Sequence, residues 1–178
     1  DALQAHLFAD TAREQAAFLL ASPVERPGVL KLLVREVLPL TGEDFAEHGA
    51  ARLVIEPRAL AWAMKRAAGE AASLILVHTH PGATDAVAFS PVDDAGEPEI
   101  FANVARRVPG RPHASMVFGR RAVAARIWRG DSAEPVDRIV VVGPRLRAVA
   151  LEQPTTFDDE RYDRQVRAFG AAGQRAVA

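Results

Sequence analysis

The feature that most constrains the fold is a nearly continuous apolar run that ends in two histidines. Residues 72–81 read ASLILVHTHP, and such a run is typical of a strand buried on both faces of a sheet. Alternate side chains of a strand point to the same face, so His78 and His80 are predicted to lie side by side at the carboxyl end of this strand. Both imidazoles can then reach one ion without distortion of the backbone.

Other segments carry shorter signals of secondary structure. A short helix is expected before Glu14, a longer one is expected to begin at Pro57 and to end near Gly69, and another is expected from about Glu97 to Val108. Together with the strands, they predict an α/β fold around one mixed sheet. Strands are expected at 15–21, 29–40, 51–57, 72–80, 113–119, 122–128, 136–143 and 146–152, the first two as a hairpin, with a polar loop at 41–50.

Composition restricts the classes of function that the chain can have. The 22 basic and 23 acidic residues give a net charge of -1 without a basic stripe, which argues against a nucleic-acid partner. Every apolar run is too short to span a membrane, so a cytoplasmic location is expected. The chain has no cysteine. Any metal must therefore be held by histidine and carboxylate side chains.

A third metal ligand is available after the histidines. Asp93 follows His80 across a loop that contains Gly and Pro, and three protein ligands would leave the fourth position of a tetrahedral zinc open, as in catalytic sites. Asp94 competes for the same role, whereas Asp85 is expected to be a solvated turn residue. The alternative for His78 and His80 is that they are ordinary residues at a strand end.

The remaining histidines and both tryptophans carry no motif. His6, His48 and His113 lack partner spacing and are expected at the surface or at the edge of the core. Trp62 and Trp128 stand on periodic segments and are expected to be packing residues.

The metal-ligand pattern resembles a known signature. His-x-His-Pro, a loop and then Ser-x-x-Asp are carried here by His78, His80, Pro81, Ser90 and Asp93, and this order resembles that of the JAB/JAMM (MPN-plus) metalloproteases. The resemblance implies a JAB/MPN, cytidine-deaminase-like fold, in which a mixed β-sheet is flanked by helices. It also implies that zinc is held by the two histidines and by the first of the two adjacent aspartates.

The resemblance, which covers roughly residues 3–130, also implies a glutamate near the first core strand that acts as general base. Glu14, Glu25 and Glu36 are the candidates. Glu14 is preferred because it precedes the first strand of the hairpin, although it could instead cap that strand. Ser90 would steady the oxyanion formed when the carbonyl is attacked. Its alternative role is that of a capping hydroxyl in the loop.

The end of the chain carries a second resemblance. The order Tyr-Asp-Arg-Gln at 162–165 and the pair Phe169 and Gly170 resemble the opening of ubiquitin-activating-enzyme-like adenylation domains. The intact protein would then join a peptidase to an activating enzyme. The expected domains are a JAB/MPN metalloprotease domain over 1–152, a linker over 153–160 and the start of a truncated activating-like domain over 161–178.

Together, the two resemblances imply a zinc-dependent isopeptidase or peptidase. It would cleave after the C-terminus of a bacterial-type ubiquitin-like protein, either to process a precursor or to release a conjugate. Two alternatives are the release of an amino acid from a carrier ubiquitin-like protein during sulfur transfer, and a non-catalytic MPN scaffold that binds partners.

Overall fold

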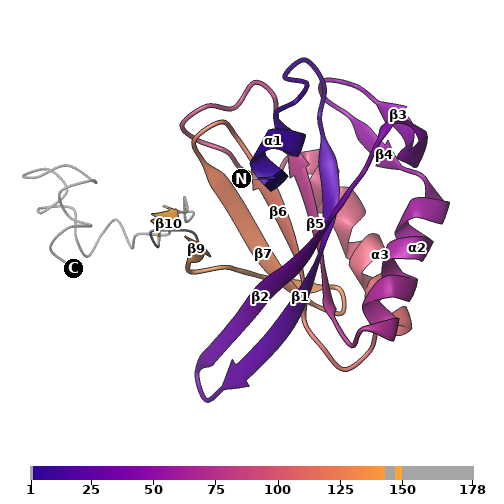
Figure 1. Ribbon diagram of the computed structural model, residues 1–178, viewed down its shortest axis with the longest axis vertical. Helices are drawn as coiled ribbons and strands as arrows, with labels where there is room; N and C mark the ends of the chain where they lie inside the picture. Colours follow the sequence, from indigo (N-terminus) through magenta and orange to yellow (C-terminus); the bar gives the residue numbers. More distant parts are fainter. Residues whose placement is uncertain (1, 143–146, 150–178) are drawn as a thin grey trace, which may run out of the picture.

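A mixed six-stranded sheet flanked by helices forms the centre of the α/β fold in the computed structural model, which describes residues 2–142 and 147–149 (Figure 1). The strand order is β2-β1-β5-β6-β7-β8, and β5 runs parallel to β6 while the other neighbours are antiparallel. The predicted linker at 153–160 and adenylation fragment at 161–178 lie outside the described residues. The strands of the central sheet are β1 Ala16–Arg26, β2 Val29–Pro39, β5 Ser73–Thr79, β6 His113–Phe118, β7 Val123–Arg129 and β8 Ser132–Pro135.

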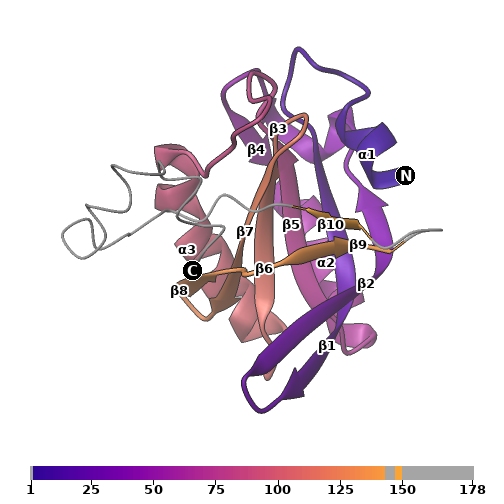
Figure 2. The ribbon, with the colours of Figure 1, turned by 90° about the vertical axis from the view of Figure 1, so that its left-hand side faces the viewer.

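Helices cover both faces of this sheet. Figures 1 and 2 show α2 and α3 together on one face, with α1 and the β9–β10 pair on the other. None of the described helices is long and apolar enough to cross a membrane. The helices are α1 Ala2–Leu7, α2 Pro57–Gly69 and α3 Pro91–Arg107, and a 3-10 turn, η1, spans Gly42–Asp44.

The alternation of side chains along β5 divides the core into two layers. Leu74 and Leu76 pack toward α2 and α3, in a cluster that also holds Phe101 and Trp128, whereas Ile75 and Val77 pack toward α1. All seven residues of β5 are buried. The prediction of a strand buried on both faces is therefore confirmed, and the side chains at even positions of β5 face the α2 and α3 layer.

The first strand of the hairpin that precedes the site is longer than predicted, whereas the second has nearly its predicted bounds. Its strand β1 continues through Arg26, and the turn lies at Pro27 and Gly28, where Gly28 has a φ of +72°. A residue without a Cβ adopts this left-handed conformation most readily. Only Ala16–Ala21 of β1 pairs with β5, so the far half of the hairpin extends beyond the central sheet (Figure 1).

Three expectations about other elements were wrong. The segment 41–50, expected to be a loop, contains η1 and strand β3, Phe45–His48, which pairs with β4, Leu53–Ile55. Strand β8 was not predicted. Strands β9, Ile139–Val141, and β10, Arg147–Val149, form their own two-stranded sheet, so the strands do not all belong to one sheet.

Helix α3 begins six residues before its predicted start near Glu97. Gly96 and Pro98 both lie within this helix, which tolerates them. Its start is set by Ser90, whose side chain accepts a hydrogen bond from the backbone N–H of Asp93, with proline at the first helical position. Asp93 therefore lies in the first turn of a helix and not in a loop.

His113 lies in the core, contrary to the expectation of a surface or edge position. Its Nδ1 accepts the backbone N–H of Leu74 at 3.0 Å, and its Nε2 donates to the carbonyl of Val108 at 3.1 Å. Burial lowers the pKa of His113, and the nearby charge of Arg111 acts in the same direction. The folded protein therefore holds this imidazole in its neutral form.

This burial predicts a loss of stability in mild acid. The unfolded chain, in which histidine titrates near 6.5, binds the proton more readily than the folded chain does. The contribution of His113 is complete above that pH and is lost as pH falls toward the lower pKa of the folded state. His113→Asn, which retains an acceptor for Leu74, should lose less unfolding free energy than the wild type between pH 7.5 and 5.5. Denaturant unfolding in chelator measures this difference, and equal losses would contradict the prediction.

Candidate metal centre

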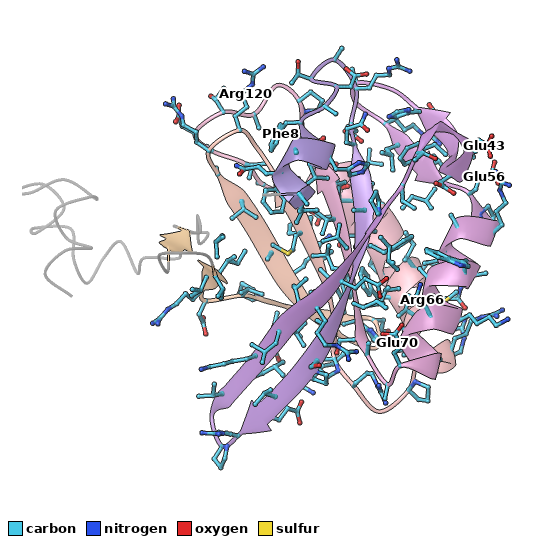
Figure 3. The ribbon with its side chains drawn as sticks, in the orientation of Figure 1. Phe8, Glu43, Glu56, Arg66, Glu70 and Arg120 are labelled. Atoms are coloured by element: carbon cyan, nitrogen blue, oxygen red, sulfur yellow. The ribbon has the colours of Figure 1, made fainter. Side chains whose placement is uncertain are left out.

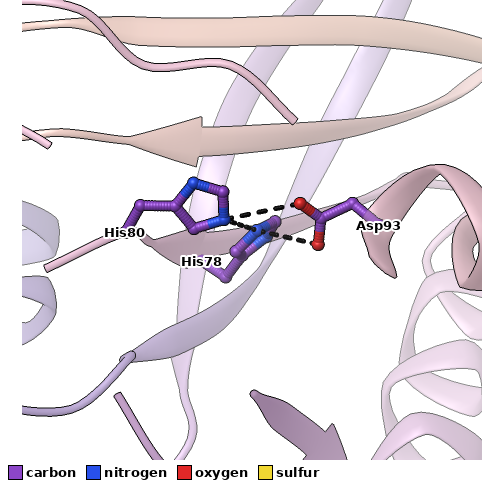
Figure 4. A group of neighbouring side chains, drawn as sticks. All are labelled: His78, His80 and Asp93. Atoms are coloured by element: carbon purple, nitrogen blue, oxygen red, sulfur yellow. Dashed lines mark hydrogen bonds and ion pairs between the residues drawn. The ribbon is translucent and has the colours of Figure 1, made fainter. Parts of the chain in front are cut away.

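Two structural elements bring the three predicted ligands together. His78 and His80 come from the carboxyl end of β5, and Asp93 comes from the first turn of α3 (Figure 4). Both histidines occupy even positions and so point toward the α3 layer, from which Asp93 approaches. Within the described part of the chain, these residues form the one group of histidine and carboxylate side chains placed to hold a metal ion.

The distances within this group match the spacing of donors around a tetrahedral ion. The Nε2 atoms of His78 and His80 lie 3.3 Å apart. The Asp93 carboxylate approaches His78 Nε2 at 3.2 Å through Oδ1 and His80 Nε2 at 3.4 Å through Oδ2. Donors that bind zinc tetrahedrally at about 2.0–2.1 Å are separated by about 3.3 Å. The spacing of the three side chains is therefore compatible with a small divalent cation between them.

Ser90 orients the aspartate of this group. Its backbone N–H donates to Asp93 Oδ2 at 2.6 Å, while its hydroxyl oxygen accepts the backbone N–H of Asp93 at 3.2 Å. This reciprocal pair is a capping box, which satisfies two backbone donors at the start of a helix. The Ser-x-x-Asp spacing thus has a local physical role, since it fixes both the start of α3 and the direction of the carboxylate.

The charges of the group are coupled. Although burial acts to raise it, the hydrogen bonds from His78 and His80 hold the pKa of Asp93 well below its usual range. The hydrogen bond to Asp93 in turn raises the pKa of His80. Two ring nitrogens that face each other beside a carboxylate need a shared proton or a cation between them. A divalent cation would compete with protons for this position.

Glu14 lies beside the metal ligands. Ala16 pairs with His78 across the sheet, and Gln15 exchanges hydrogen bonds with Thr79, so Glu14 stands level with His80. Antiparallel partners project to the same face, which directs Glu14 toward the α3 layer as well. Its side chain is buried, with 8% exposed.

The surroundings of Glu14 change its acidity. Burial raises the pKa of Glu14, and the charge of Asp93 adds to this, while His78, His80 and His48 act in the opposite direction. A carboxylate with a raised pKa accepts a proton more readily near neutral pH. The backbone of Glu14 is fixed by His48, the last residue of β3, and by Gly49, which follows it. The imidazole of His48 donates to the backbone carbonyl of Glu14 at 2.7 Å. The backbone N–H of Glu14 donates to the carbonyl of Gly49 at 2.9 Å.

The other two glutamate candidates lie elsewhere. Glu36 pairs across the hairpin with Leu20, six residues and therefore about 20 Å along β1 from Glu14. Its carboxylate binds Arg66 at 2.8 Å, and Figure 3 shows Arg66 on α2 near Glu70, the residue that directly follows this helix. Glu25 makes an exposed ion pair with Arg129 near the hairpin turn. Neither carboxylate is near the metal ligands.

The competing aspartates also have other partners. Asp94 forms an ion pair with Arg126 at 2.6 Å and is turned away from the histidines. Asp85 binds Arg121 at 2.7 Å with both side chains largely exposed, as expected for a solvated turn residue.

The two tryptophans differ from each other. The ring of Trp128 is buried and stacks on Phe101 at 4.9 Å, which confirms its packing role. Trp62 is 47% exposed on the outer face of α2, so the same expectation was wrong for Trp62.

Two charged residues behind the ligands were not identified from the sequence. Glu97 is buried, with 3% exposed, and Arg126 contacts it from β7. The burial of Glu97 could have been predicted from the sequence, because Glu97 lies on the same helical stripe as Phe101 and Val104. A carboxylate on the apolar stripe of a helix needs a buried partner, and Arg126 supplies it.

No protein-family model matches the chain, and no curated protein matches it. Its function is therefore inferred from the residues that the fold brings together.

Proposed function

We propose that this chain is a zinc-dependent peptidase of the JAB/JAMM type with a JAB/MPN fold. The observation that carries the proposal is the convergence of His78, His80 and Asp93 at donor spacing, with the buried carboxylate of Glu14 beside them. Two neutral imidazoles and one carboxylate suit zinc, and three protein ligands are typical of catalytic rather than structural zinc sites. When bound there, zinc lowers the pKa of a water molecule to about 7 and polarises a carbonyl group.

The residues of the chain account for the proton transfers of amide hydrolysis. Glu14 accepts a proton from the attacking water as the oxygen of the water forms a bond to the carbonyl carbon of the substrate. It then donates this proton to the amine nitrogen as the C–N bond breaks, which leaves a free amine and a carboxylic acid, and the acid loses its remaining proton to solvent. Burial raises the pKa of Glu14 and so suits it to both steps. The hydroxyl of Ser90, at the start of α3, would steady the oxyanion, while its backbone N–H holds the Asp93 carboxylate in position.

The proposed substrate is a bacterial-type ubiquitin-like protein, either with a C-terminal extension or joined to a lysine. The resemblance of residues 162–165 to an activating enzyme supports this choice, because activation requires a free C-terminal carboxylate. A peptidase fused to such an enzyme would supply that carboxylate from a precursor or a conjugate.

A cleavage assay tests this function. The purified chain, with zinc or with chelator, is incubated with a panel of ubiquitin-like proteins that carry either a peptide extension or an isopeptide-linked lysine peptide. Mass spectrometry should find zinc-dependent cleavage directly after the last residue of the ubiquitin-like protein. Release of only a single terminal amino acid would favour the carrier role in sulfur transfer. Binding of zinc and of a panel member without any cleavage would favour the scaffold role.

A further inference from the structure

Arg126 connects the strand β7 to the helix that carries Asp93. Its Nη1 lies 2.6 Å from Oδ1 of Asp94, and its Nε donates to Oε2 of Glu97 at 2.9 Å. Both carboxylates belong to the first two turns of α3. Asp94 directly follows the candidate ligand Asp93, and Glu97 lies one helical turn after it. The Arg126 side chain is only 15% exposed. One guanidinium group therefore binds the start of α3 at two points.

The same guanidinium also reaches the histidine side of the metal centre. Its central carbon lies 3.9 Å from the centre of the Phe89 ring, a stacking contact between a cation and an aromatic face. The Phe89 ring centre is in turn 6.4 Å from that of His78. Phe89 directly precedes Ser90, so Arg126 packs against both sides of the turn that begins α3.

The buried partner of Arg126 is itself fixed by hydrogen bonds. Oε2 of Glu97 accepts the hydroxyl of Ser115 at 2.5 Å, and that hydroxyl accepts Nε1–H of Trp128 at 2.9 Å. Apolar residues could fill such a position with little loss of stability, because the desolvation of a buried ion pair offsets much of its attraction. The ion pair between Arg126 and Glu97 is thus better explained by the geometry that it imposes than by stability.

We propose that Arg126 is a positioning residue of the metal centre. By binding Asp94 and Glu97 and by packing on Phe89, it holds the first turn of α3 where the Asp93 carboxylate meets the two histidines. This inference rests on the proposed function, since it concerns the same metal ligands. Groups that orient metal ligands typically change metal affinity by 10–100-fold when removed.

Cobalt binding tests this role without an activity measurement. Arg126→Met keeps the length and the apolar stem of the side chain but removes every donor. We expect its Co²⁺ affinity to fall by about 10–100-fold and its visible absorption at saturating Co²⁺ to differ from that of the wild type. Arg126→Lys keeps the charge but cannot bind two carboxylates in a fixed fork, so it should recover only part of the loss. Circular dichroism and unfolding in chelator establish that each variant is folded.

A matched control lies three residues away on the same strand. Arg129 makes only an exposed ion pair with Glu25, so Arg129→Met should bind Co²⁺ with wild-type affinity and spectrum. Asp94→Asn removes the exposed ion pair of Arg126 and leaves its contact with Glu97 intact. A loss of Co²⁺ affinity in this variant, smaller than that expected for Arg126→Met, supports the proposal even if Arg126→Met does not fold. Wild-type affinity and spectrum in both Arg126→Lys and Asp94→Asn would overturn the positioning role alone. Failure of the wild type to bind Co²⁺ or Zn²⁺ would instead overturn the proposed function.

Discussion

Replacement of Glu14 by Gln should leave zinc bound and lower turnover by roughly 10²–10⁴ in the cleavage assay. Gln keeps the shape and the hydrogen-bonding capacity of the side chain but cannot accept the proton from water. The backbone contacts of residue 14 with His48 and Gly49 do not involve the carboxylate, so the start of β1 should keep its position. Elemental analysis for zinc and steady-state kinetics on the same sample separate a loss of chemistry from a loss of metal.

Two matched variants serve as controls for this result. Glu25→Gln removes an exposed ion pair with Arg129, and Glu36→Gln removes contacts between β2 and Arg66 of α2. Neither change should affect turnover beyond a small factor. If either control abolished turnover while Glu14→Gln remained active, the assignment of the base would be wrong and another carboxylate would have to take this role.

Removal of a metal ligand should abolish both metal binding and cleavage. His80→Ala deletes one of three donors, so the purified variant should contain no stoichiometric zinc and should show no turnover. Asp93→Asn should have a milder effect. The amide oxygen can still accept the N–H of Ser90 and keep the start of α3, but it is a neutral and weaker ligand. Occupancy and turnover should fall together, and excess zinc should partly restore both.

Zinc content and activity measured over a range of added zinc decide this prediction. Asp85→Asn is the control, because Asp85 lies in the same connection between β5 and α3 but binds only the exposed Arg121. It should keep full zinc occupancy. A wild-type protein that contained no metal, bound no added zinc and gained no activity from it would contradict the enzymatic proposal.

Elements with strong local signals were predicted well from the sequence. The apolar run of β5 could hardly adopt another role, and Pro57 with its following apolar stripe placed helix α2 within a residue of its observed bounds. That stripe, which contains Leu60, Met64 and Ala67, already placed Trp62 on the opposite face. The exposure of Trp62 could therefore have been predicted from helical periodicity alone.

Elsewhere a local signal had two meanings. Helix α2 ends at Gly69 as predicted, but the residue with a positive φ is Ala71, at +50°. The N–H of Ala72 reaches back to the carbonyl of Ala67, which closes the helix in the manner usually seen with glycine. Similarly, Ser90 and Asp93 were interpreted as parts of a metal signature, with a loop-capping hydroxyl as the alternative for Ser90, and the structure shows that the two residues also form the capping box that begins α3.

The sequence by itself determined the kinds of ligand and the pairing of His78 with His80, because the two-residue period of a strand fixes which neighbours share a face. It also provided Glu14 as one of three candidate bases. Only the tertiary structure decided that Glu14 and Asp93 reach the same point, from a neighbouring strand and from a helix on the facing layer. The order of strands and the position of α3 depend on contacts between residues far apart in the chain, such as those of Arg126 with Asp94 and Glu97. No local periodicity encodes those contacts, because they form only when separate elements pack against one another.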